Sequence, residues 1–197
     1  MKILVLDCAF NPTVAIIVDG EEKVKNVNLQ ENHSDGFMRL IDKSLKDVKM
    51  LLSDIDIIAV NVGPGSFTGL RVAVSIVKGF AFGDDKKVLP FTSFDYVETK
   101  NNVLVSGFSN FVYKKNTKNV MSCEQIGLLK KSAKYVVFDL NLYEKLIKYG
   151  LKLDFIEKKS YSEILKNKNK FVKINELEPL YLRKSQAEIE KENRKNG

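Results

Sequence analysis

The residues that could do chemistry lie at the end of the first apolar run and in one glycine-rich loop. Asp7 directly follows the run KILVL, where a strand-end carboxylate could hold a metal ion or a phosphate. The loop GPGSFTGLR, residues 63–71, carries three glycines between two apolar runs. Because a glycine-rich turn that opens a helix leaves backbone N–H groups unpaired, such a loop could bind an anion.

Neither feature has the full pattern that its chemistry needs. The spacing G-x-G-x-x-x-G differs from the dinucleotide-binding and P-loop spacings, and no lysine follows the last glycine. Two-metal catalysis needs carboxylates at neighbouring strand ends, where this chain offers Asn61. Asp7 could equally accept N–H bonds from its own turn, and Ser66 and Thr68 are typical of helix starts. Two interpretations of the loop therefore stay open, an anion site or a turn that seats the following helix.

The single histidine, His33, limits other kinds of catalysis. A serine triad would have to combine it with Asp35 and either Ser34 or Ser66, yet a histidine just before a helix is more often a capping or interface residue. The two cysteines are far apart and form no C-x-x-C pair, so the sequence predicts neither a disulfide framework nor a thiolate zinc site.

The composition predicts a globular protein of the cytoplasm. Hydrophobic residues make up 44% of the chain and charged residues 29%. No apolar run reaches the ~18 residues of a membrane helix, and Asp7 follows the first run too early for a signal peptide. The formal net charge is +7, and residues 86–170 hold 17 basic against 8 acidic side chains. Compositional drift explains this excess better than an RNA surface, because no aromatic-interleaved arginine cluster accompanies it.

The apolar pattern predicts which elements position these residues. Three strands are expected in KILVL, TVAIIVDG and KVKNVNL, and then a helix of about five turns over residues 33–53 with Ser34 as N-cap. A strand over 54–63, a helix over 66–83 and a strand over 88–94 complete the order βββαβαβ. That order is the one of the ribonuclease-H-like fold, which actin-like nucleotidases share.

A second, smaller α/β lobe is expected after a boundary near residue 98. It spans residues 99–184, and residues 185–197 form a polar tail. It is expected to contain strands over 103–108 and 110–115, a helix over 123–133, a strand over 134–139, a helix over 142–150 and a strand over 151–159.

The second helix is too apolar to cover only one face of a sheet. One row holds Leu70, Val74, Val77 and Ala81, and further apolar residues, Val72, Ala73, Ile76 and Phe80, fill most of the remaining circumference. Such a helix needs cover on two sides, from a neighbouring helix or from another chain. Burial at about 25 cal/mol per Å² of apolar area is enough to drive association, while a fully internal helix is the alternative.

Four stretches read together, LDCA, ENHSDGFMRLI, residues 54–83 and EPLYLRK, make the chain resemble the bacterial TsaB family, also called YeaZ. GPGSFTGLR behind an apolar strand is the signature of that family. The signature residues here are Gly63, Pro64, Gly65, Ser66, Phe67, Thr68, Gly69 and Arg71. The match covers residues 1 to about 95 and resumes at 178–183. The resemblance implies an actin-like (ASKHA) fold with a degenerate nucleotide site, of which Asp7 is the vestige.

The resemblance also implies a function and partners. Family members are non-catalytic subunits of the machinery that makes N6-threonylcarbamoyladenosine in tRNA, next to the anticodon. They pair with the catalytic paralogue TsaD, are joined by the ATPase TsaE, form homodimers when alone, and reach tRNA indirectly, with no membrane contact. No tightly bound cofactor is expected, and ATP or ADP at the complex interface stays open. The metal-binding H-x-x-x-H of the paralogue falls on His33 and Phe37, so no metal is expected.

In the family, the first two helices form the contact with TsaD or with a second copy. The partner-facing residues implied by position are His33, Phe37, Leu40, Ile41 and Leu45 on the first helix and Leu70, Val74, Val77 and Phe80 on the second. Two departures concern the second lobe: SGF stands at Ser106–Phe108 where many relatives have Asp-Ala-Arg, and the lobe is short. The rival hypotheses are an actin-like ATPase or phosphotransferase and a glycoprotease-like peptidase.

Overall fold

The computed structural model describes residues 1–27, 34–83, 86–166 and 168–183. The chain forms two compact units, of which the first contains residues 1–98 and 157–179 and the second contains residues 99–156 and 180–183. The sequence assigns all of 99–184 to the second lobe, and residues 157–179 correct that division. They join the first unit because Tyr161, Leu165 and Leu177 are buried there. The polar tail, residues 185–197, lies outside the described residues.

The first unit is built on a five-stranded sheet with the order β3-β2-β1-β4-β5. Strands β1 (Lys2–Asp7), β2 (Thr13–Val18) and β3 (Glu21–Val27) form an antiparallel meander, and β4 (Ile57–Asn61) and β5 (Lys87–Phe91) run parallel to β1. The strands β1 and β4 are aliphatic at almost every position because both of their faces are covered. The predicted order βββαβαβ is confirmed.

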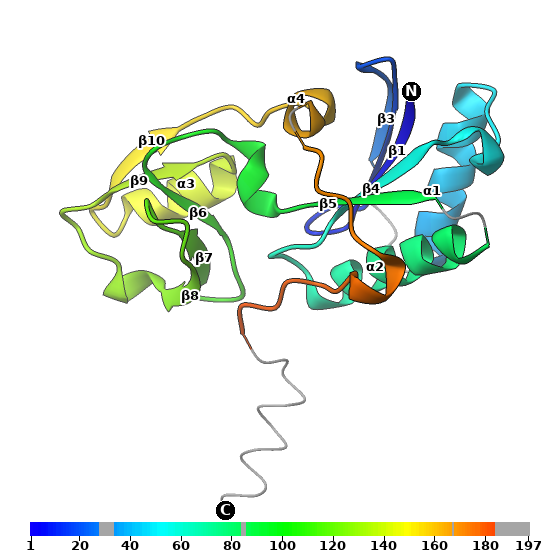
Figure 1. Ribbon diagram of the computed structural model, residues 1–197. Coiled ribbons are helices and arrows are strands. Elements are labelled where there is room, and N and C mark those ends of the chain that lie inside the picture. Colours follow the sequence, from blue (N-terminus) through cyan, green and yellow to red (C-terminus); the bar gives the residue numbers. More distant parts are fainter. Residues whose placement is uncertain (28–33, 84–85, 167, 184–197) are drawn as a thin grey trace, which may run out of the picture. The chain divides into compact units, whose positions relative to one another are not determined.

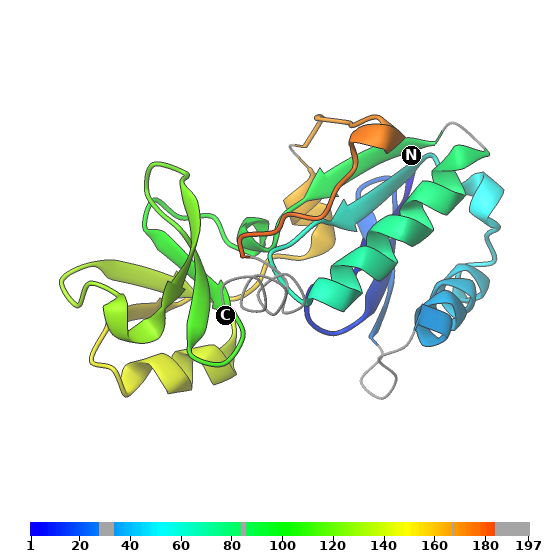
Figure 2. The ribbon, with the colours of Figure 1, turned by 90° about the horizontal axis from the view of Figure 1, so that it is seen from below.

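Two long helices cover one face of this sheet. Helix α1 (Ser34–Asp47) packs on β2 and β3, and α2 (Phe67–Phe82) packs on β4, β1 and β5. Figure 2 shows α2 running across the strands with α1 beside it. On the opposite side of the sheet from α2 lies the short helix α4 (Tyr161–Leu165), as Figure 1 shows. The 3-10 turn η4 (Ile174–Glu176) and a bridge between Val88 and Val172 complete the unit.

Helix α1 ends earlier than its apolar pattern predicts. The structure ends it at Asp47 instead of near residue 53, and a separate 3-10 turn, η1 (Leu52–Asp54), follows. Lys49 takes a φ of 54°, a left-handed conformation that stops the helix, and the Met50 N–H donates to the Leu45 carbonyl at 2.9 Å. Helix α2 has the predicted bounds, with Ser66 as N-cap and Gly83 as C-cap.

The second unit holds another five-stranded sheet, with the order β10-β9-β6-β7-β8. Its elements are β6 (Asn102–Ser106), β7 (Phe111–Lys115), β8 (Met121–Gln125), β9 (Lys134–Val137), α3 (Leu140–Ile147) and β10 (Lys152–Phe155). The predicted helix over 123–133 is wrong. Residues 121–125 pair with β7 instead, because the turn at Asn116–Asn119 closes a hairpin in which Asn119 has a φ of 61°. The 3-10 turn η3 (Ile126–Leu128) follows. None of the described helices is long and apolar enough to span a bilayer.

Candidate functional site

Asp7 ends β1 with its carboxylate inside the first unit, where the residue is only 2% exposed. One oxygen, Oδ1, accepts hydrogen bonds from the Ala9 N–H at 3.0 Å and from Asn61 Nδ2 at 3.1 Å. The other, Oδ2, accepts from the Tyr161 hydroxyl at 2.8 Å and from the Tyr96 hydroxyl. Because a carboxylate offers about four acceptor positions, these donors fill them, and a metal ion or phosphate would have to displace them.

The two tyrosines of this cluster remain neutral donors. Burial, followed by the neighbouring Asp7 charge, raises the pKa of both hydroxyls, at Tyr96 and at Tyr161, well above its usual value. The ring of each tyrosine also faces a lysine: Lys158 Nζ lies 3.4 Å from the centre of the Tyr96 ring, and Lys25 Nζ lies 5.3 Å from that of Tyr161. Each lysine charge thus lies near a ring whose hydroxyl bonds to Asp7, and nearby positive charge stabilises the buried Asp7 carboxylate.

Asn61 connects this cluster to the signature loop. Its Nδ2 lies 3.1 Å from Ser93 Oγ and 3.0 Å from the Tyr96 hydroxyl, and its Oδ1 accepts the Gly63 N–H at 2.8 Å. The Asn61 and Ser93 side chains are fully buried. The end of β4 and the first residue of the loop are thus fixed by the same network that holds Asp7.

The signature loop packs its backbone against the turn after β1. A Cβ atom on Gly65 would overlap the Ala9 carbonyl oxygen, and one on Gly69 would overlap that of Cys8, so both positions need glycine. The Ser66 N–H donates to the Ala9 carbonyl at 2.7 Å. Two loop N–H groups, those of Gly63 and Ser66, therefore bond within the protein, which favours the turn that seats a helix over the anion site.

The remaining signature residues shape the start of α2. Ser66 Oγ accepts the Gly69 N–H at 3.2 Å, which is the predicted capping role, while Thr68 is exposed and lies in the first turn. The Gly63–Pro64 peptide bond is cis. The Arg71 guanidinium lies 4.4 Å from the centre of the Phe67 ring. The loop thus leads into a capped first turn of α2, where the Arg71 guanidinium lies over the Phe67 ring.

A hollow of about 420 Å³ lies beside the helix start and reaches across to α1. Its lining includes Cys8 from the β1 end, Phe37 from α1, and Thr68 and Val72 from α2. Burial and the Asp7 charge raise the pKa of the Cys8 thiol, so it stays protonated and is a poor nucleophile. Phe37 and Val72 make one side of the hollow apolar. Among the described residues, no group of three His, Cys, Asp or Glu side chains could hold a metal ion.

Most residues expected to face a partner are buried within the single chain. The buried ones, packed against the sheet of their own unit, are Phe37, Ile41, Leu45, Leu70, Val74 and Val77. Their assignment to a partner contact stays a prediction, and within this chain each helix turns its most apolar row toward its own strands. Leu40 and Phe80 are half-buried and stay available. His33 lies outside the described residues.

A second apolar row on α2 remains partly open to solvent. Val72, Ile76 and Phe80, spaced by four residues, are each half-buried, and Val72 lines the hollow that Phe37 of α1 also lines. On α1, Met38 is 42% exposed. Val72 and Ile76 belong to the second apolar side of α2 that the sequence indicates, whereas Met38 of α1 was not among the residues expected to face a partner.

A family model matches the part of the chain that contains the signature loop. The model of the TsaD family, described as tRNA N6-adenosine threonylcarbamoyltransferase, matches residues 27–113. The tRNA threonylcarbamoyladenosine biosynthesis protein TsaB of Haemophilus influenzae is 35% identical over 94 residues, which are 47% of this chain and 40% of that protein. A tRNA N6-adenosine threonylcarbamoyltransferase of Staphylococcus epidermidis is 30% identical over 106 residues, which cover 45% of this chain and 31% of that protein.

The fold has a counterpart among solved structures. YeaZ from Pseudomonas aeruginosa superposes with a TM-score of 0.67 at 19% identity, and the match covers 92% of this chain and 99% of that one. The resemblance to TsaB and YeaZ and the actin-like α/β fold are thereby confirmed. The sequence matches to these two curated relatives span less than half of either relative.

Proposed function

We propose that this chain is a non-catalytic scaffold subunit for the synthesis of N6-threonylcarbamoyladenosine next to the anticodon of tRNA. In this role it pairs with a catalytic paralogue of the TsaD kind, and an ATPase of the TsaE kind joins the pair. The names of two curated relatives support the pathway: one is a tRNA threonylcarbamoyladenosine biosynthesis protein and the other a tRNA N6-adenosine threonylcarbamoyltransferase. The same helix face would hold a second copy when the paralogue is absent, and the complex would work in the cytoplasm.

The observation that carries the pairing proposal is the half-buried row on α2. Val72, Ile76 and Phe80 are half-buried apolar side chains, and Val72 lines a hollow together with Phe37 of α1, while the neighbouring row of α2 already covers the sheet. A surface helix normally has a single apolar face, so this second row needs its own cover. Helices α1 and α2 of a partner would supply it in a four-helix contact, and a stable contact of this kind buries about 800 Å² on each partner.

The non-catalytic role is supported by the state of Asp7. In an actin-like ATPase or phosphotransferase, a carboxylate at this strand end must reach a metal ion or phosphate. Here both oxygens are saturated by hydrogen bonds from Ala9, Asn61, Tyr96 and Tyr161. A calorimetric titration of the lone chain with ATP and magnesium tests this point. Tight binding with turnover would favour the enzyme hypothesis over the scaffold.

Pairing is tested by co-purification with the TsaD-type protein of the same genome. Ile76→Glu places a charge in the middle of the half-buried row and should weaken binding at least about 30-fold, since a central interface residue contributes roughly 2 kcal/mol or more. Ser75→Glu adds the same charge at the exposed neighbouring position and should leave the affinity within about twofold. Equal affinities of the two variants would place the contact elsewhere.

The function itself is tested by reconstituting tRNA threonylcarbamoylation from purified components. The TsaD-type and TsaE-type partners and tRNA are held constant, and this chain is added or left out. We expect modification only in its presence, and Ile76→Glu should reduce it while Ser75→Glu should not. Full modification without this chain would reject the scaffold role even if the pairing is real.

A further inference from the structure

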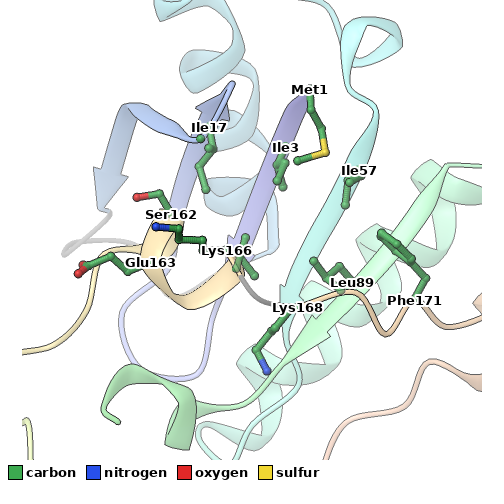
Figure 3. Close-up of a pocket in the computed structure, with 12 residues that line it drawn as sticks. Met1, Ile3, Ile17, Ile57, Leu89, Ser162, Glu163, Lys166, Lys168 and Phe171 are labelled. Atoms are coloured by element: carbon green, nitrogen blue, oxygen red, sulfur yellow. The ribbon is translucent and has the colours of Figure 1, made fainter.

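An apolar cavity of about 410 Å³ opens on the face of the first sheet that α1 and α2 do not cover. Figure 3 shows Ile3, Ile17, Ile57 and Leu89 rising from four strands to form its floor. The side chains on α4 stand on one side, and Phe171 of the returning chain stands on the other. All of these residues belong to the first unit. The size lies within the range of small-molecule sites.

The floor gives a ligand no polar partner. Ile3, Ile17, Ile57 and Leu89 are aliphatic, and the backbone of their four strands is paired within the sheet. A ligand that reaches the floor must therefore carry an apolar chain or ring, because an unpaired polar group there would lose its hydrogen bonds to water. Phe171, which is 42% exposed, offers an aromatic wall that water now contacts.

The charged side chains at the edge of the cavity favour a negatively charged ligand. Lys166 is exposed, and no acidic side chain of the described chain forms an ion pair with it. The acidic group at the edge, Glu163, is already bound by the Ser160 N–H at 2.9 Å and the Ser160 hydroxyl at 2.8 Å, as part of a helix cap. Lys168 is paired with Asp95 at 3.0 Å.

A second lysine strengthens this preference. Lys87 Nζ lies 5.7 Å from the centre of the ring of Phe171, which lines the cavity. Lys166 in the lining and Lys87 beside Phe171 thus add positive charge near the apolar floor. With Lys168 neutralised by Asp95, these two lysines outweigh the single Glu163 carboxylate, and a net positive charge beside a low-dielectric hollow attracts anionic ligands.

We propose that this cavity binds a small amphipathic carboxylate, with its apolar chain on the isoleucine floor and its carboxylate beside Lys166. The site lies on the opposite side of the sheet from the helices proposed for pairing, so a ligand and a paired partner would not compete for the same surface. This binding is independent of the scaffold role.

Decanoate serves as the probe, with decanol and decylammonium as matched neutral and cationic ligands. Titration calorimetry with the full chain should show saturable decanoate binding with one site per chain. Decanoate should bind more tightly than either analogue, and each methylene removed from the acid should weaken binding by roughly fourfold, the effect expected for burial of one CH₂ group. No saturable binding up to about 1 mM, the weak end of useful affinities, would reject the site.

Variants separate the two parts of the site. Lys166→Glu should weaken decanoate binding about tenfold and leave decanol unchanged, because it reverses the charge at the edge only. Lys170→Glu makes the same change at an exposed lysine outside the cavity and should have no effect. Equal loss in both variants would show nonspecific attraction and contradict the proposal.

Filling the cavity tests the floor. Ile57→Phe adds a ring at its centre and should abolish decanoate binding while the melting temperature stays close to that of the parent chain. If this variant does not fold, Phe171→Ala removes the exposed wall and should weaken decanoate binding at least about fivefold. Undiminished binding in a folded variant would place decanoate elsewhere and overturn the proposal.

Discussion

Asp7 stands at a strand end where a carboxylate could bind a metal ion or a phosphate, but its carboxylate accepts hydrogen bonds from within the protein. A carboxylate at the end of the first strand is visible in the sequence, but its partners are not, because Tyr96 and Tyr161 are 89 and 154 residues away along the chain. The structure gives Asp7 no ion-pair partner among the described residues and four hydrogen-bond donors instead. Such bonds to a charged acceptor are strong, and a buried charge without them would not be tolerated.

The bond from Tyr161 to Asp7 can be measured by removing one hydroxyl. Tyr161→Phe keeps the ring but takes one donor from the carboxylate, so the free energy of unfolding should fall by about 2 kcal/mol. For a chain of this size, the melting temperature should drop by roughly 4–8 °C. Tyr149→Phe, at a partly exposed tyrosine, is the control and should change little. Equal stabilities of the two variants would contradict the role given to Tyr161.

The same tyrosines predict a loss of stability in alkali. The pKa of Tyr96 and of Tyr161 is raised in the folded chain, so both stay protonated at pH values where the unfolded chain ionises them. Their contribution is complete below pH ~10, the ordinary tyrosine value, and is lost as the pH rises toward the folded pKa. Unfolding by urea at several pH values measures this loss. In Tyr161→Phe the decline above pH ~10 should be shallower by up to about 1.4 kcal/mol per pH unit.

At the scale of elements, α2 depends on the close approach of its first turn to the end of β1. Gly69→Ala places a methyl group against the Cys8 carbonyl and should lower the free energy of unfolding by roughly 2–4 kcal/mol. Gly79→Ala makes the same change further along the helix, where a Cβ meets no atom, and should raise it by up to about 1 kcal/mol. Thermal melting of both variants checks the two signs. A stabilised Gly69→Ala would contradict the tight packing of the loop.

The elements whose pattern is local were predictable from the sequence. Helix α2 has its predicted bounds because a serine cap and a terminal glycine mark its ends. Two errors have physical causes outside the local pattern. Lys49 adopts a left-handed conformation that ends α1 early, and residues 123–125 join a hairpin although their spacing resembles a helix. Periodicity also showed two apolar rows on α2 but could not tell which row faces the sheet.

Substitutions on the buried row and on the half-buried row of α2 should have different effects. Val77→Glu, on the buried row, puts an unpaired charge under the helix, so it should unfold the first unit and lower its melting temperature by more than about 10 °C. Ile76→Glu, one position away on the half-buried row, should leave the fold largely intact and affect only pairing. Circular dichroism melts of the two variants separate these effects. A fully stable Val77→Glu would show that this row does not belong to the core.

At the scale of the whole molecule, the first unit is assembled from two distant parts of the chain. Residues 157–179 supply Tyr161 to the Asp7 cluster, and Val172 forms a bridge to β5. No local signal in the sequence shows that a late segment returns to an early sheet, which is why the second lobe was predicted to extend to residue 184. Only the tertiary contacts of buried side chains such as Leu177 decide its place.

The returning segment makes a strong prediction about excision of the second unit. The Lys159 N–H donates to the Tyr96 carbonyl at 2.9 Å, and Lys159 Nζ pairs with Glu98 at 2.6 Å, so the two ends of the excised part lie close together. Replacing residues 99–156 by a flexible linker of about four residues should therefore leave a folded first unit. A dispersed amide NMR spectrum and a cooperative melt would show that fold.

The matched control is the fragment of residues 1–98 alone. It lacks Tyr161, so Asp7 loses a donor, and it exposes the cavity floor from Ile3 to Leu89 to water. We expect this fragment to aggregate or to bind hydrophobic dyes, because a large apolar face of its sheet has no cover. If the fragment melts as cooperatively as the linked unit, residues 157–179 contribute little to the first unit.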